Sequence, residues 1–380
     1  MKSKVLAIYL PQFHSIPEND KWWGIGFTEW TNVKRGKSFY PGHYQPRIPY
    51  HKNYYDLSDP SVLEKHIQMA RDAKIAGFAF YHYYFTGKKL IEKPIENYRD
   101  HSKENFPYCL IWANQSWART WYRANGEKEM LLEQVYGEEK EWREQFEYLY
   151  SFFEDERYIK IDNKPLYVIY LPQDIKKGKE MFELWNALAK EKGFDGLYLV
   201  AMNTGWGLDR TQNLYDAYMN FEPIQTICND MSYRRQLQQI KREHVEKVHR
   251  EKCNLTNRLF AQNAYTYSYL CKQIEQGYGV ESMKKTYLGA FPGWDNSARK
   301  DEDSWIIRNS TPKRFGKHVE RMLRCSEKLG NEYLFINAWN EWSEGAYLEP
   351  DERYGYAYLE ELKRSIIRYE KDEISCNMGD

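Results

Sequence analysis

Two glutamates near the end of the chain have the residue type and spacing that acid–base chemistry needs. Glu341 and Glu344 lie three residues apart in the run NAWNEWSEG, flanked by Trp339, Trp342 and Gly345. If the chain turns tightly there, both carboxyls face one cleft, where apolar shielding and like-charge repulsion should raise one pKa while the other carboxyl ionises. Cleaving or forming a glycosidic bond requires such an acid beside a base or nucleophile.

The alternative for this pair is a structural or binding role, in which one glutamate pairs with an arginine. The geometry should distinguish the two. Both carboxyls directed into one open cleft would favour an enzyme, whereas a carboxyl held against an arginine would favour binding or structure.

Eight short apolar, β-branched or aromatic runs alternate with amphipathic stretches along the whole chain. Such alternation predicts eight βα units, which favour a closed (β/α)8 barrel in a single catalytic domain over residues 1–380. A doubly wound sheet is the alternative, but no Gly-rich turn follows the first run. The expected strands are Val5–Leu10, Phe78–Tyr84, Tyr108–Ala113, Leu166–Leu171, Leu197–Met202, Ala217–Phe221, Thr286–Phe291 and Tyr333–Ala338.

Helices are expected between most of these strands, at residues 61–76, 139–154, 179–192 and 313–329, with residues 356–369 closing the chain. Residues 226–283, between the sixth and seventh strands, contain a long basic stretch with helical character. We interpret this segment as a helical insertion, an elaborated loop over the barrel mouth. Its basic face is expected to be solvated, although a basic helix can also bind phosphate.

Polar and aromatic residues recur where seven of the eight strands end, which is where barrel enzymes build their active sites. This pattern predicts a broad cleft for neutral polyols. Some candidates have simpler interpretations: His82 as a core histidine, Asn114 and Asn203 as helix caps, and the acidic residues as partners of arginines. The candidate substrate-binding residues are Gln12, His14, Glu29, Trp30, His82, Tyr84, Trp112, Asn114, Gln115, Trp117, Asn203, Glu222, Trp294, Asp295, Trp339, Asn340 and Trp342.

The composition narrows the class of ligand. Lysine plus arginine (55) equals aspartate plus glutamate (55), so the chain lacks the field that would attract nucleic acid or an anionic membrane. Aromatic residues make up 17% of the chain, with 13 Trp and 33 Tyr, and aromatic faces suit sugars. Six scattered cysteines indicate neither a metal site nor a disulfide framework, and no cofactor is expected. The absence of a signal peptide and of a membrane-spanning run predicts a cytoplasmic protein without an integral membrane segment.

Several long runs resemble the WbsX-type proteins of bacterial polysaccharide loci, which are related to glycoside hydrolase family 99. The runs include IYLPQFHSIPENDKWWGIGFTEWTNV, GFAFYHYYFTGKKL, FPGWDNSAR and FINAWNEWSEGAYLEPD. The resemblance implies a (β/α)8 barrel without a metal and retaining, endo-acting hydrolysis of α-mannosidic linkages. By this resemblance, Glu341 deprotonates the sugar's own 2-hydroxyl, and Glu344 protonates the leaving oxygen. Such a route needs an axial 2-hydroxyl, as in mannose or rhamnose.

The chain also departs from the group, which has glutamate and asparagine where this chain has Gln115 and Ser116, so the substrate is expected to differ. Pro172 and Gln173 stand where many other barrel glycosidases carry an Asn-Glu acid site.

Two other functions stay open. One is a glycosyltransferase or transglycosylase of O-antigen, other lipopolysaccharide or capsule assembly, for which the acidic run at residues 301–303 is the nearest metal motif. The other is a non-catalytic carbohydrate-binding barrel.

Overall fold

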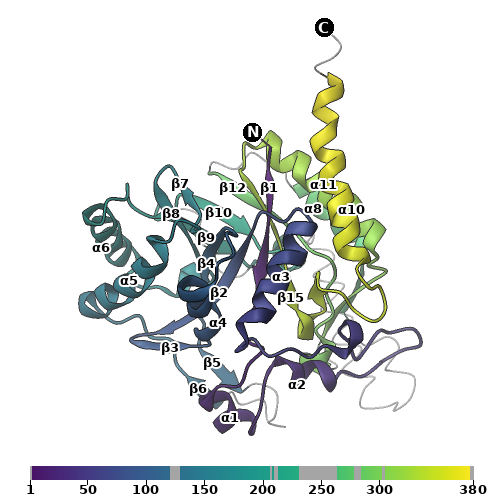
Figure 1. Ribbon diagram of the computed structural model, residues 1–380, viewed down its shortest axis with the longest axis horizontal. Coiled ribbons are helices and arrows are strands. Elements are labelled where there is room, and N and C mark those ends of the chain that lie inside the picture. Colours follow the sequence, from purple (N-terminus) through teal and green to yellow (C-terminus); the bar gives the residue numbers. More distant parts are fainter. Residues whose placement is uncertain are drawn as a thin grey trace.

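Eight parallel strands form a closed barrel in the computed structural model, which describes residues 2–119, 129–205, 208, 213–230, 263–277, 284–301 and 304–376 (Figure 1). β1 pairs with both β2 and β14, which closes the barrel. The predicted (β/α)8 fold is confirmed, and each predicted strand overlaps an observed one. The barrel strands are β1 (Lys4–Tyr9), β2 (Gly77–Phe85), β4 (Tyr108–Trp112), β8 (Lys164–Ile169), β9 (Tyr198–Asn203), β10 (Ala217–Asn220), β12 (Thr286–Ala290) and β14 (Tyr333–Ile336).

Helices cover the outside of the barrel, and five of them coincide with the helices predicted from the sequence. Two begin where short polar side chains cap them: the Asp59 carboxylate accepts from the Ser61 N–H at 2.9 Å, and Thr311 accepts from the Arg314 N–H. A proline occupies the first position of both helices. The covering helices are α3 (Pro60–Asp72), α4 (Lys93–His101), α5 (Glu139–Phe153), α6 (Gly178–Glu191), α8 (Tyr267–Gly277), α10 (Pro312–Lys328) and α11 (Ala357–Cys376).

The predicted insertion at residues 226–283 lies only partly within the described residues, and its basic stretch, residues 234–252, lies outside them. The described end contains β11 (Asn263–Thr266), which pairs in parallel with β13 (Trp305–Arg308). It also contains α8, which packs against α10. The Tyr267 hydroxyl at the start of α8 donates to the Phe291 carbonyl at 2.6 Å. This part of the segment is therefore the barrel's own helix between β10 and β12.

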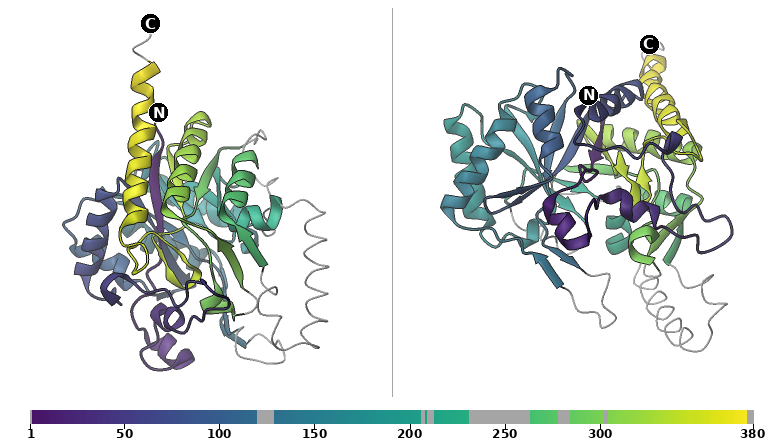
Figure 2. Two further views of the ribbon diagram at one scale, coloured as in Figure 1. Left: turned by 90° about the vertical axis from the view of Figure 1, so that its right-hand side faces the viewer. Right: turned by 60° about the horizontal axis from the view of Figure 1, so that its bottom comes forward.

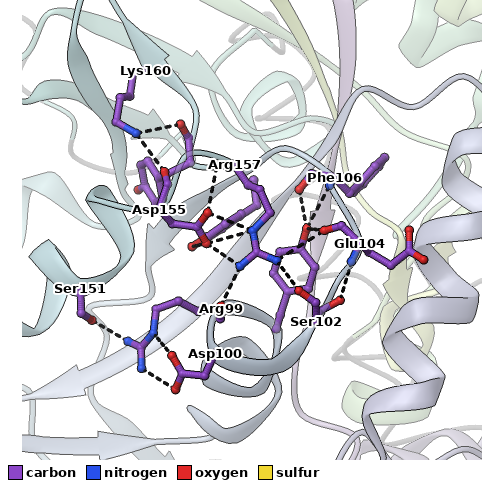
Figure 3. Close-up of polar contacts among 12 residues, drawn as sticks. Arg99, Asp100, Ser102, Glu104, Phe106, Ser151, Asp155, Arg157 and Lys160 are labelled. Carbon is purple, nitrogen blue, oxygen red and sulfur yellow. Dashed lines mark hydrogen bonds and ion pairs between the residues drawn. The ribbon is translucent and has the colours of Figure 1, made fainter.

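A polar network at the amino-terminal end of β4 ties neighbouring elements together (Figure 3). The Arg157 guanidinium donates to the Arg99 carbonyl in α4 at 2.7 Å and to the Ser102 carbonyl just after it at 3.1 Å. It also pairs with Asp155 at 2.7 Å. The network satisfies carbonyls that a helix end leaves open. Because it lies at the opposite end of the barrel from the expected active site, its role is structural.

The carboxyl ends of the strands carry short added elements that lie in the lower half of Figure 1 and come forward in the right-hand view of Figure 2. They surround the place where a barrel builds its site. They are α1 (Pro17–Trp23) and α2 (Glu29–Lys34) after β1, β3 (Lys88–Leu90) after β2, β5 (Trp117–Arg119) and β6 (Glu129–Leu132) after β4, and β15 (Asn340–Glu341), η6 (Trp342–Glu344) and β16 (Ala346–Tyr347) after β14.

Candidate active site

A cavity of about 570 Å³ opens at the carboxyl ends of the strands, and all eight barrel strands or the loops that follow them contribute to its lining. Glu341 and Glu344 both line it. Of the predicted binding residues, Gln12, Gln115 and Trp294 line it as well. The cavity thus brings together the catalytic candidates and three of the residues expected to bind substrate.

The turn after β14 directs both glutamates into this cavity. Glu341 ends the short strand β15, pairs with Ala346 across an antiparallel ladder, and is followed by a single 3-10 turn that places Glu344 one turn on. Gly345 ends the turn with φ of 62°. A Cβ at this glycine would lie 3.0 Å from the backbone nitrogen of Asp295. Glycine therefore permits both the left-handed backbone and the close approach of the loop after β12.

Burial controls the charge of both carboxyls. Burial, together with repulsion from Glu344 and Glu29, raises the pKa of Glu341 well above its ordinary value, against the attraction of Arg299. Burial also raises the pKa of Glu344, although Arg299 and Lys300 lower it. Glu341 Oε2 is buried without a hydrogen-bond partner among the described atoms. The pair therefore retains a proton at a pH where exposed glutamates are ionised.

Arg299 contacts one member of the pair. Its guanidinium lies 3.1 Å from Glu344 Oε1 and 3.8 Å from Glu29 Oε1. The geometry therefore shows both features that were to distinguish the two roles. The two carboxyls share an open cavity, which favours an enzyme, and one of them contacts an arginine, which favours binding or structure. The pKa of Glu344 is nevertheless raised, so the contact does not outweigh its burial.

A second cavity of about 360 Å³ adjoins the first and shares Gln12, Gln115 and Arg299 with it. The predicted residues Glu29 and Trp117 line this neighbour. Two aromatic side chains of the WWGIGFTEW run also line it, Trp23 and Phe27, which stack with ring centroids 5.7 Å apart. The two cavities therefore lie next to each other, and both are lined by aromatic and amide groups.

Two predicted residues of β2 lie outside both cavities. Tyr84 stacks on a tyrosine of α5, and His82 Nε2 is 2.7 Å from the Tyr167 hydroxyl. Burial lowers the pKa of His82 to about 3, so it is a neutral core histidine. Tyr81 and Tyr83 line the cavity in their place. Since side chains alternate along a strand, a one-residue difference in register exchanges the two sets.

Four predicted tryptophans are buried in the core and do not reach the cavities. Trp112 packs against a tryptophan of α6, and Trp30 donates its ring N–H to a backbone carbonyl at 2.8 Å. Trp342 stacks on Tyr347, with ring centroids 3.8 Å apart. Trp339 is fully buried. These rings support the loops from behind because their apolar area drives them into the core.

Three predicted asparagines and one histidine fix loop backbones. Both amide atoms of Asn340 bond the backbone of Leu10, at 2.7 and 2.9 Å. Asn114 makes the same kind of pair with the loop after β8, and the Asn203 side-chain oxygen accepts from the Gly205 N–H at 3.3 Å in the loop after β9. The His14 ring contacts a backbone carbonyl at 3.1 Å. Their polar atoms are thus used within the fold, as buried polar groups generally are.

Two predicted acidic residues also serve the fold. Glu222 accepts from the Thr226 hydroxyl at 3.0 Å and from its N–H at 3.3 Å. Asp295 accepts from His43 and Gln45, each at 2.9 Å. Neither side chain lines the two cavities.

Several residues that line the cavity were not predicted, because their signals in the sequence are weak. Arg299 ends the FPGWDNSAR motif and Lys300 follows it, and a basic pair at that position resembles ordinary surface charge. Tyr81 and Tyr83 lie one position from the candidates His82 and Tyr84. The missed polar and aromatic residues include Tyr81, Tyr83, Tyr170, Gln173, Asn296, Arg299, Lys300 and Trp305.

The acidic run at residues 301–303, the nearest metal motif for the transferase alternative, lies mostly outside the described residues. Of its three residues, the structure describes Asp301. The described ranges contain no cluster of three or more histidine, cysteine or acidic side chains suited to a metal. None of the helices in those ranges is long and apolar enough to cross a bilayer.

Fold and site together define a class: a (β/α)8 barrel in which a buried and a half-buried carboxyl share a cleft at the carboxyl ends of the strands. The family model described as "Glycosyltransferase WbsX" matches residues 5–362, so the chain belongs to the WbsX family. The resemblance stated from the sequence is thereby confirmed.

Curated relatives and solved structures resemble the chain over nearly its whole length. The uncharacterized protein WxcX, from two strains of Xanthomonas campestris pv. campestris, is 30% identical over 371 residues, which are 97% of this chain and 50% of WxcX. The chain therefore spans about half the length of these curated relatives. The endo-α-mannosidase of glycoside hydrolase family 99 from Bacteroides thetaiotaomicron shares 13% identity over 97% of both chains, with a TM-score of 0.54. A glycoside hydrolase-like protein shares 14% identity over 96% of this chain and 94% of its own, with a TM-score of 0.55. At such identities the structural likeness concerns the fold alone.

Proposed function

We propose that this protein is an enzyme that acts on glycosidic bonds, with Glu341 and Glu344 as its catalytic carboxyls. The observation that carries the proposal is that a buried carboxyl, Glu341, and a half-buried one, Glu344, line one open cavity and both have raised pKa values. Burying two carboxyls side by side disfavours their charged forms. A barrel that only binds sugar gains little from this arrangement, whereas an acid–base pair depends on it.

The reaction that we propose is retaining, endo-acting hydrolysis of an α-linked mannose- or rhamnose-type residue in a bacterial polysaccharide. Glu341 removes the proton of the sugar's 2-hydroxyl, whose oxygen attacks the anomeric carbon while Glu344 protonates the departing oxygen. Glu344 then deprotonates a water that opens the resulting anhydro-sugar, and Glu341 returns the proton to the 2-oxygen. The partnerless Oε2 of Glu341 is available to accept the hydroxyl. The adjoining cavity supports endo action because it adds room for further sugar units.

These roles require the shared proton to change position when substrate binds. In the free site Arg299 favours the charged form of Glu344, so the proton favours Glu341. The Glu29 carboxylate lies 3.8 Å from the same Arg299 guanidinium and can bind it in place of Glu344. We infer that substrate draws Arg299 toward Glu29, which lets Glu344 hold the proton while Glu341 ionises toward the sugar hydroxyl.

A glycan cleavage screen without sugar nucleotide tests the proposal. The substrates are α-linked mannan and rhamnose-containing bacterial polysaccharides, and the variants are Glu341→Gln and Glu344→Gln. Glu352→Gln, an exposed glutamate of the same loop, is the matched control. We expect the wild type and the control to release product and both active-site variants to lose about 10³-fold or more in rate. Glu344→Gln should keep its affinity for glycan. Full activity in either active-site variant would refute the assignment of the pair.

A glycosyltransferase is the second candidate, and the description of the matching family model favours it. Adding nucleotide sugars to the same reactions distinguishes the two activities. Transfer by a wild type that releases no product on its own would replace hydrolysis with transfer. Saturable glycan binding with neither activity would identify a carbohydrate-binding barrel.

A further inference from the structure

A cavity of about 370 Å³ lies behind the wall of the candidate active site. Trp294 lines both this cavity and the one that holds the glutamate pair. The turn after Glu344 also forms part of the wall, because Gly345 lines the rear cavity. β13 divides its residues between the two sides, with Trp305 toward the active site and Arg308 toward the rear.

Four arginines from distant parts of the sequence line this rear cavity: Arg47, Arg308, Arg314 and Arg353. Arg47 has a carboxylate neighbour, Asp295, at 3.4 Å. The other three form no ion pair within the part of the chain that the structure describes. Arg47 and Arg308 are half-buried, whereas Arg314 and Arg353 are exposed and partly screened by water. Positive charges gathered along one lining repel one another and favour a bound anion.

The two aspartates of the cavity supply only part of that compensation. Asp295 already accepts from several side chains of its own surroundings. Asp351 accepts from the Tyr347 hydroxyl at 2.7 Å and from the Tyr354 N–H at 2.6 Å. Four positive charges against two negative ones leave a surplus of two on the lining.

The arginines are held in place in a way that suits a ligand. Arg308 lies over the Tyr40 ring at 4.4 Å, and Arg47 and Arg353 lie over the Tyr44 ring at 4.8 and 5.1 Å. Stacking fixes a guanidinium plane and leaves its N–H edge available. The Nε atoms of Arg47 and Arg308 are buried without a hydrogen-bond partner.

A helix end adds to the same field. α10 begins at Pro312 after the cap Thr311, which lines the cavity. The amino end of a long helix carries partial positive charge and attracts anions.

We propose that the rear cavity is an oxyanion site for a carboxylate or phosphate group, distinct from the candidate active site and independent of its proposed function. Arginines bind both groups through paired N–H donors. Carboxylates occur on acidic sugars, and phosphates occur free or in the diphosphate of a nucleotide sugar. Occupancy should be felt at the glutamate pair, because the Asp295 N–H donates to the Glu344 carbonyl at 2.7 Å across the shared wall.

Isothermal titration of the full chain with three anionic probes tests the proposal: inorganic phosphate, pyrophosphate and sodium glucuronate. Glucose at matched ionic strength is the neutral control. The variants are Arg308→Gln and Arg353→Gln. Arg364→Gln is the matched control, since this exposed arginine of α11 pairs with glutamates of its own helix. We expect saturable binding of at least one anion and a loss of affinity of about tenfold or more in each cavity variant.

The pattern of binding identifies the source of the oxyanion. Glucuronate binding that both cavity variants lose would assign the site to an acidic sugar, and pyrophosphate or phosphate binding alone would assign it to a phosphate. Arg353 is exposed, so its variant is expected to fold, and circular dichroism verifies this. The proposal is refuted if no anion binds saturably, or if the cavity variants bind as well as Arg364→Gln.

Discussion

Replacing Asp295 by asparagine should destabilise the protein in a pH-dependent way. The carboxylate is 1% exposed, and its Oδ2 accepts from His43 and Gln45 at 2.9 Å each, with Arg47 at 3.4 Å. Its Oδ1 accepts from the Ser297 hydroxyl at 2.6 Å. Although burial opposes ionisation, the hydrogen bond from His43 and the charge of Arg47 lower the pKa of Asp295 to about 2.

The magnitude follows from this shift. A change from 3.8 to about 2 is nearly two pKa units, which at about 1.36 kcal/mol per unit corresponds to roughly 2.5 kcal/mol of stability. Because the folded pKa lies below the unfolded one, the contribution of Asp295 is fully present above about pH 4 and declines as the pH falls toward 2. Asparagine does not ionise, so the Asp295→Asn variant should lose this contribution to the free energy of unfolding at neutral pH.

Urea unfolding monitored by tryptophan fluorescence, from pH 7 down to pH 3, measures the effect. The difference between wild type and Asp295→Asn should be constant from pH 7 to about 5 and shrink below pH 4. Asp195→Asn, at an exposed aspartate, is the control and should change little. A difference that does not depend on pH, or that is absent at pH 7, would refute the reasoning.

Three further predictions concern the turn that carries Glu341 and Glu344. Glu341→Gln should stabilise the protein at pH 7, because burial raises the pKa of this carboxyl and its ionisation therefore opposes folding; the gain should disappear below about pH 4 in the same urea experiment, where the carboxyl is protonated in both states. Gly345→Ala should cost about 1–2 kcal/mol for the left-handed backbone alone and should also reduce kcat, since the added Cβ presses on Asp295; equal stability and kcat would contradict this. Asn340→Ala should lower the free energy of unfolding in urea by about 1–3 kcal/mol, because it leaves the buried N–H of Leu10 without an acceptor. A loss of less than about 0.5 kcal/mol, which is the scale of a neutral surface substitution, would count against that role.

The sequence was sufficient for the barrel because its signals are local. Each strand is a short apolar run such as Val5–Leu10, and each helix an amphipathic stretch such as residues 139–154, so both can be recognised from their own spacing. The pair of glutamates was also recognisable, since Glu341 and Glu344 are close in sequence. The side of a strand on which each residue lies could not be recognised from the sequence. Because β2 buries all nine of its residues, hydropathy does not distinguish Tyr83, which lines the cavity, from Tyr84, which does not.

The sequence by itself determined the fold class, the family and the carboxyl pair of the candidate site, because these depend on residues near one another along the chain. Tertiary structure alone decided which strand-end residues reach the cavity and which support it from the core. It also decided that Arg299 lies between Glu29 and Glu344, and that Arg47 and Arg353, some three hundred residues apart, share one cavity. A net charge of zero conceals such a cluster, because composition sums charges over the chain whereas electrostatic attraction depends on the distances that folding sets.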